Sequence, residues 1–131
     1  MEYLKNTYLA FVLSPASRER LLTIFKPKFS KVICHHVTID FNLTEDRLKK
    51  FKHLLDEAPG VLVKGYACGD CIECISVKVG SNSIRKDGSF YHITLSLEPP
   101  HKPVESNKLF DLLTPFSRNL LLDGSFQLLT K

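Results

Sequence analysis

Two short segments of this 131-residue chain repeat one pattern of side chains. Residues 36–39 read His-Val-Thr-Ile and residues 92–95 read His-Ile-Thr-Leu. The alternation of polar and apolar residues predicts a strand in both places. Because successive side chains of a strand point to opposite faces, each segment places an imidazole and a hydroxyl on one face and two apolar side chains on the other.

These two pairs have a chemistry that suits a phosphodiester. Imidazole titrates near neutral pH, so one of His36 and His92 can take a proton from a nucleophile while the other gives one to a leaving oxygen. The hydroxyls of Thr38 and Thr94 can donate to phosphate oxygens. A single His-x-Thr segment is more often ordinary strand, but two alike copies among five histidines favour a catalytic pair, in which either histidine can be the base. His35 is expected to point to the opposite face and to have a structural role.

Three further side chains are candidates for substrate binding. Tyr8 lies in a run that predicts a first strand, where it either stacks on a base or joins the core. Lys86 precedes the second motif in a polar loop, beside Arg85, and Lys102 follows the motif in a proline-rich loop. Each of these cations is either a phosphate contact or a solvated surface charge.

A competing signal comes from the cysteines. Cys68, Cys71 and Cys74 have the spacing of a zinc or iron–sulfur site, for which Cys34 or His35 would be the fourth ligand. Residues 71–79, however, alternate in a way that is better explained by a strand, and a strand places Cys71 and Cys74 on opposite faces. We therefore expect neither a metal site nor a cofactor.

The elements that must position the motifs can be predicted from local signals. Ser14-Pro15 favours the start of a helix, and Pro59-Gly60 favours the end of another. Ser106 is expected to cap a short helix. The sequence predicts an α+β domain with strands at 7–13, 31–41, 61–67, 71–79, 89–97 and within 120–129, helices at 15–26, 44–59 and 106–113, and a loop at 98–104.

Composition limits the class of protein. The chain is 44% hydrophobic and 24% charged, which is typical of one folded domain over residues 1–131 and excludes a disordered tail or a collagen-like repeat. The net charge of +4 suits an anionic partner without requiring one. No signal peptide or membrane span is recognised, and the four cysteines are expected to be free thiols, so a reducing, cytoplasmic compartment is predicted.

The paired motifs and the order of elements resemble the two-histidine (2H) phosphoesterase superfamily, over nearly the whole chain. Its members include LigT-like RNA cyclic phosphodiesterases and phage enzymes that degrade cyclic oligonucleotide signals (anti-CBASS type). The resemblance implies a pseudo-symmetric, two-lobed fold of antiparallel sheets around a central cleft with helices outside, and metal-independent hydrolysis. It also implies that His36 and His92 are catalytic and that Thr38 and Thr94 bind phosphate. The 56-residue separation of the motifs (92 − 36) is short for the superfamily and implies trimmed recognition loops.

The leading functional prediction is a hydrolase that cleaves a nucleotide phosphodiester. The substrate is either an RNA end with a 2′,3′-cyclic phosphate or a cyclic oligonucleotide, because both reactions need a base and an acid on opposite sides of phosphorus. The alternative is a module that binds a nucleotide or RNA end without turnover. Neither a membrane nor an obligatory protein partner is expected.

Overall fold

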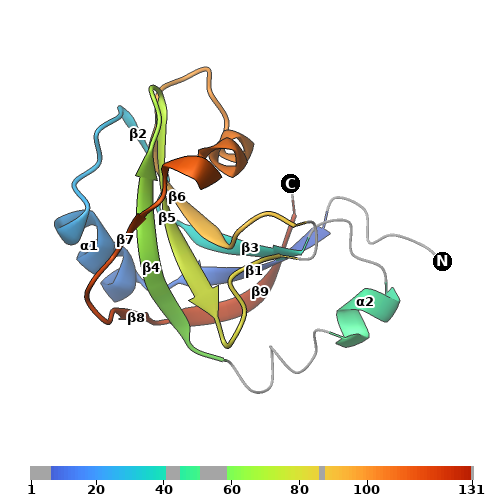
Figure 1. The fold of residues 1–131 in the computed structure, drawn as a ribbon. Helices are drawn as coiled ribbons and strands as arrows, with labels where there is room; N and C mark the ends of the chain where they lie inside the picture. Colours follow the sequence, from blue (N-terminus) through green and yellow to red (C-terminus); the bar gives the residue numbers. More distant parts are fainter. Residues whose placement is uncertain (1–6, 41–44, 51–58, 86–87, 131) are drawn as a thin grey trace.

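The computed structural model describes residues 7–40, 45–50, 59–85 and 88–130. Antiparallel strands dominate the described part of the chain, with two α-helices and one 3₁₀ helix, η1 (Figure 1). The elements are β1 (Thr7–Leu13), α1 (Pro15–Ile24), β2 (Lys31–Val32), β3 (His36–Asp40), α2 (Glu45–Lys50), β4 (Val61–Cys68), β5 (Ile72–Val79), β6 (His92–Leu97), η1 (Pro103–Leu112), β7 (Thr114–Pro115), β8 (Leu121–Leu122) and β9 (Gly124–Thr130).

The nine described strands form one sheet, which confirms the expected antiparallel architecture. Their main order is β7-β4-β5-β6-β3-β1-β9, while β2 pairs with β6 and β8 pairs with β4. The two strands that carry the His-x-Thr motifs, β3 and β6, are therefore neighbours in the middle of the sheet. Each of these two strands pairs with a neighbouring strand on both of its sides, which holds the motifs in place.

Helical segments lie on both faces of the sheet (Figure 1). On the α1 side, Leu21 is fully buried in the main core, and Leu22 and Phe25 pack against that core. On the other side, Leu109 of η1 joins a smaller core with Phe90. The two cores fix the sheet between α1 and η1.

Helix α1 begins where the local signals predict it. The Ser14 side chain accepts a hydrogen bond from the Ser17 backbone N–H at 3.1 Å, and Pro15 takes the first helical position. The Ser17 hydroxyl in turn accepts from the Asp123 N–H at 2.7 Å, which ties the helix to the segment before β9. The cap thus helps to place an edge of the sheet as well as a helix end.

The strand predicted over 31–41 is wrong in its middle, where β2 and β3 are separated. Cys34 has a φ of 41°, in the left-handed region that few non-glycine residues adopt. Its N–H still donates to the Thr94 carbonyl at 2.9 Å, and the Leu13 N–H donates to the His35 carbonyl at 3.0 Å. The chain therefore stays bound to both neighbouring strands while it changes direction, so simple alternation fails just before His36.

The other helices differ from expectation in extent. Of the helix predicted over 44–59, the structure describes Glu45–Lys50, and the remainder lies outside the described residues. The short helix predicted at 106–113 is the 3₁₀ helix Pro103–Leu112, which begins earlier because Glu105 accepts from the Lys102 backbone N–H at 2.7 Å. Among the described residues, the longest helical segments have ten residues, too few to cross a bilayer.

Candidate active site

The two His-x-Thr motifs meet at a single facing pair of core residues. Val37 of β3 lies opposite Ile93 of β6, and both are fully buried. The residues on either side of this pair point to the other face of the sheet. His36 and Thr38 of β3 and His92 and Thr94 of β6 therefore lie on the same face, on adjacent strands.

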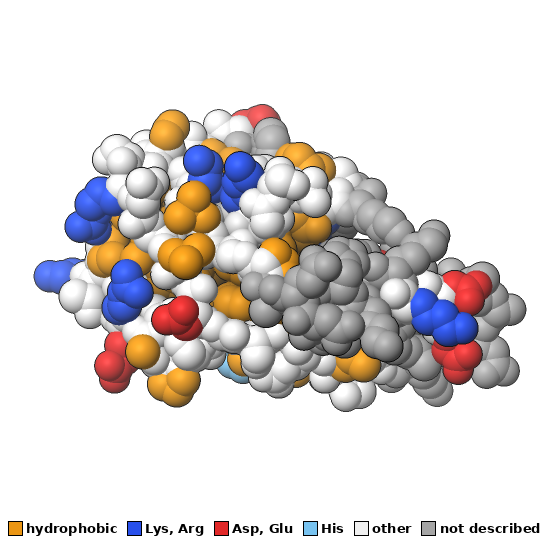
Figure 2. Space-filling model, turned by 90° about the horizontal axis from the view of Figure 1, so that it is seen from below, with side chains coloured by type: hydrophobic (Ala, Val, Ile, Leu, Met, Phe, Trp, Pro, Cys, Tyr) orange, Lys and Arg blue, Asp and Glu red, His pale blue; other side chains and the backbone are white. Residues whose placement is uncertain are grey.

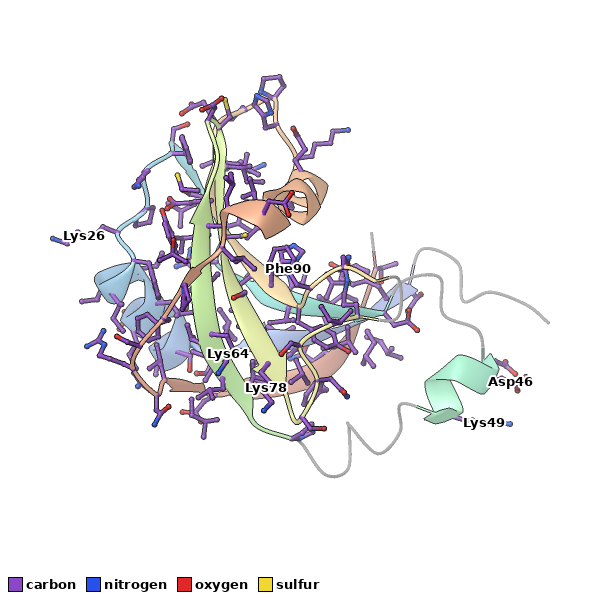
Figure 3. All side chains as sticks on the ribbon, in the orientation of Figure 1. Lys26, Asp46, Lys49, Lys64, Lys78 and Phe90 are labelled. Carbon is purple, nitrogen blue, oxygen red and sulfur yellow. The ribbon has the colours of Figure 1, made fainter. Side chains whose placement is uncertain are left out.

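His92 is held by its own strand segment. Its Nδ1 lies 3.0 Å from the Phe90 carbonyl oxygen, which can only accept, so Nδ1 carries the proton. The Phe90 ring packs against the imidazole at 5.0 Å between centroids and lies on the η1 side of the sheet (Figure 3). In the neutral ring the lone pair is then on Nε2, which is the arrangement that a general base needs.

His36 is half-buried and electrostatically coupled to its neighbours. Burial, together with the positive charges of His35 and His92, lowers its pKa from 6.5 to about 4. The contribution of His92 indicates that the two motif histidines lie close enough for their charges to repel. At neutral pH His36 is therefore an uncharged imidazole.

The expectation that His35 points away from His36, to the opposite face of the sheet, is wrong. Its Nδ1 lies 2.9 Å from Nδ1 of His36, and the two rings meet edge to face with centroids 5.1 Å apart. The physical reason is the left-handed backbone at Cys34, which interrupts strand alternation directly before the motif. Its adjacency to His36 in the sequence was a signal for this contact, but the alternation rule pointed the other way.

Tyr8 lies beside His36, on the face of the sheet that carries the motif histidines and threonines. Stacking on a base, one of its two predicted roles, requires this position. Its ring centroid is 5.6 Å from that of His36, at an interplanar angle of 46°. The side chain is half-buried. Tyr8 and Phe90 therefore each place an aromatic ring against one motif histidine.

The two threonines differ in their surroundings. Thr38 is half-buried and lies opposite Ala10 of β1. Thr94 is buried, and its hydroxyl is 2.9 Å from that of Ser106 and 3.4 Å from the Pro103 carbonyl oxygen. The prediction that Ser106 caps a helix is wrong, because η1 begins three residues before it and its hydroxyl bonds to the motif instead.

The predicted cationic contacts fall in different places. Lys86 lies outside the described residues. Lys102 is exposed just before η1. Arg85 is buried, and its Nε donates to the Ser89 hydroxyl at 2.8 Å, so it is not a solvated surface charge. On the face in Figure 2, lysine and arginine side chains are interspersed with apolar ones over the described part.

Two of the four cysteines, Cys34 and Cys74, are buried thiols, and Cys68 and Cys71 are half-buried. All four are free. Burial raises the pKa of Cys34 to about 11 and that of Cys74 to about 12, which disfavours the thiolate that a metal requires. Within the described ranges, no group of three or more His, Cys, Asp or Glu side chains could hold a metal ion.

Comparison of the chain with models of known families, with curated proteins and with solved structures finds no match. The function proposed below is therefore supported by the residues of the site themselves.

Proposed function

We propose that this chain is a metal-independent phosphodiesterase that hydrolyses a nucleotide phosphodiester with a pair of histidines, as in the two-histidine phosphoesterases. One observation carries the proposal: the two His-Thr pairs lie on adjacent antiparallel strands that meet at Val37 and Ile93. Two motifs that were similar only by chance would have no reason to lie on neighbouring strands of the folded sheet.

The sheet also divides in a way that suits the two-lobed arrangement of that superfamily. Strands β4, β5 and β6 form one run, strands β3, β1 and β9 form another, and the two runs join where β3 pairs with β6. We assign these runs to the two lobes, so that each lobe contributes one motif from its innermost strand. The catalytic face then lies at their junction.

The hydrogen bonds of the imidazoles favour one division of labour. His92, with its proton on Nδ1, receives at Nε2 the proton of the attacking water or ribose hydroxyl. The new P–O bond forms as the bond to the leaving oxygen breaks, and the leaving oxygen takes a proton from His36. The substrate class is a 2′,3′-cyclic phosphate end or a cyclic oligonucleotide.

The hydroxyls bind the phosphate between the two rings. Thr38 donates to one non-bridging oxygen. The Thr94 and Ser106 hydroxyls are 2.9 Å apart, and either can be the donor. With Ser106 as the donor, the Thr94 proton makes only a long 3.4 Å contact with the Pro103 carbonyl and can turn to the phosphate. Tyr8, beside His36, stacks on the base.

A substrate panel tests this function. The panel contains a 2′,3′-cyclic mononucleotide, an RNA with a cyclic-phosphate end, and cyclic di- and trinucleotides, each incubated with EDTA. We expect the wild type to cleave at least one member, and His36→Ala and His92→Ala to lower its rate by about 10²-fold or more. His101→Asn is the matched control, because His101 is a half-buried histidine outside the two motifs, paired with Glu105 at 2.9 Å. Binding of a panel member without cleavage would support the nucleotide-binding alternative instead.

A further inference from the structure

The contact between His35 and His36 is built into the backbone. The left-handed turn at Cys34 is fixed by the Arg18 Nε, which donates to the Cys34 carbonyl at 3.1 Å. The next carbonyl, that of His35, accepts from the Leu13 N–H at 3.0 Å. Helix α1 and strand β1 therefore both hold the segment that turns the His35 ring toward His36.

Two ring nitrogens 2.9 Å apart can form a hydrogen bond only if one of them carries a proton. His35 is exposed, whereas His36 is half-buried. Because burial disfavours a positive charge on His36, we assign the proton of this hydrogen bond to His35. His35 then donates from Nδ1 to Nδ1 of His36, which leaves the proton of His36 on Nε2.

The hydrogen bond between His35 and His36 resolves a difficulty in the acid step of the proposed reaction. A general acid must have a proton to give at the working pH. With a pKa of about 4, His36 is uncharged near neutral pH, and a neutral imidazole that loses its proton without compensation is a poor acid. If Nδ1 of His36 receives a second proton as Nε2 loses its own, His36 stays neutral and this difficulty is removed.

We propose that His35 passes a proton to His36 as His36 gives its own proton to the leaving oxygen. This inference rests on the proposed phosphodiesterase function. The His36 Nε2 proton passes to the leaving oxygen as the P–O bond breaks, and the His35 Nδ1 proton passes to Nδ1 of His36. The products are two neutral imidazoles, His36 with its proton on Nδ1 and His35 with its proton on Nε2. Once the product leaves, a proton from water binds Nε2 of His36 as its Nδ1 proton returns to Nδ1 of His35, which restores the starting arrangement.

The other titratable groups at His36 are compatible with this direction of transfer. Among the described residues, Tyr8 of β1 contacts its ring and His92 of β6 adds a repelling positive charge when protonated. When His92 becomes protonated as the base, its charge favours proton release from His36. The two steps of the reaction therefore support each other.

The proton arrangement can be measured without any substrate. Long-range ¹H–¹⁵N correlation spectra of the labelled protein at pH 7 distinguish the two imidazole tautomers, and His36→Ala assigns the signals of His36. We expect a proton on Nε2 of His36 and on Nδ1 of His35. A proton on Nδ1 of His36 would overturn the relay, whether or not the protein has hydrolase activity.

Two substitutions then separate a relay from a purely positioning role. His35→Asn keeps a donor near Nδ1 but cannot pass a proton onward, and His35→Ala removes the side chain. We expect both to lower the hydrolysis rate near neutral pH by about 10- to 100-fold, because the acid step loses its proton source. Imidazole added to the buffer should restore much of the rate of His35→Ala, because the position is exposed.

The control is His101→Asn, which should keep its rate and show no response to imidazole. A His35→Asn enzyme at the wild-type rate, or a His35→Ala enzyme that imidazole does not restore, would overturn the relay. If no panel member is cleaved by the wild type, the proposed function fails, and the spectra still decide where the shared proton lies.

Discussion

Val37 lies directly opposite Ile93 where β3 meets β6, and the four residues that flank this buried pair are the histidines and threonines of the two motifs. The apolar pair anchors both strands in the core, while its neighbours point to the opposite face of the sheet. A slip of either strand by one residue would send the histidine and threonine of that strand into the core, so the register is strongly specified. The core thereby fixes the geometry of the candidate active site.

The first prediction concerns Thr38, the half-buried hydroxyl of the β3 motif. Thr38→Val removes the hydroxyl and keeps the branched shape, so we expect kcat/KM on a cleaved substrate to fall about 10-fold or more while stability changes by less than about 1 kcal/mol. Thr38→Ser, which keeps the donor, should retain most of the rate. Equal rates for the valine and serine variants would contradict a phosphate-binding role.

The second prediction concerns pH and stability. The folded-state pKa of His36, about 4, lies below its ordinary value of 6.5, so the unfolded chain binds this proton more readily than the folded one. His36 makes its full contribution to the free energy of unfolding above about pH 6.5. This contribution, at most about 3 kcal/mol, is lost as the pH falls toward 4. Urea unfolding at pH 7.5 and 4.5 should show a smaller loss for His36→Asn than for the wild type. An equal loss in both proteins would count against the lowered pKa.

The third prediction concerns Ser106, which is fully buried and bonds to Thr94. Ser106→Ala leaves the Thr94 hydroxyl without this partner, so we expect a cost of about 1 to 2 kcal/mol in the free energy of unfolding, measured in urea. Ser125→Ala is the matched control, since the Ser125 hydroxyl accepts from Gln127 at an exposed position. That change should cost less than about 0.5 kcal/mol, and a similar cost for both would show that the buried contact is unimportant.

Much of the fold follows from signals within a few residues. Ser14-Pro15 specifies the start of α1 because a cap and a fixed φ act on the next turn alone. The alternation within 72–79 specifies β5, and the repeated motif specifies both β3 and β6. These signals need no knowledge of distant residues, which is why the sequence could reveal them.

The predictions that were wrong concern features that depend on contacts between residues far apart in the sequence. The turn at Cys34 exists because Arg18 and Leu13 bind the backbone of residues 34 and 35, and neither contact has a local signal. The same holds for Ser106, which is 12 residues from Thr94 in the sequence. The sequence therefore located the motif residues themselves, but it missed the side chains that position them.

The fourth prediction concerns Glu73, a fully buried carboxylate on β5. It accepts hydrogen bonds from the Tyr66 hydroxyl, the Ser96 hydroxyl and the Lys28 backbone N–H, and so joins the segment after α1 to the sheet. Glu73→Ala leaves three donors without their acceptor, and we expect it to cost about 3 kcal/mol or more in urea unfolding.

The control for Glu73 is Glu98→Ala, because Glu98 accepts a hydroxyl hydrogen bond at 2.6 Å on the surface. We expect that change to cost less than about 0.5 kcal/mol. A small effect at Glu73 would mean that the Lys28 segment is held to the sheet by its other contacts.

The most direct test of the central claim is whether His36 and His92 act as one catalytic unit. We would measure hydrolysis of the panel with EDTA for the wild type, His36→Ala, His92→Ala and the double variant. Residues that act as a unit are far from additive, so each single variant should lose about 10²-fold or more and the double variant should lose little beyond the worse of the two. A single variant that keeps the wild-type rate, or losses that multiply in the double variant, would contradict a two-histidine phosphodiesterase.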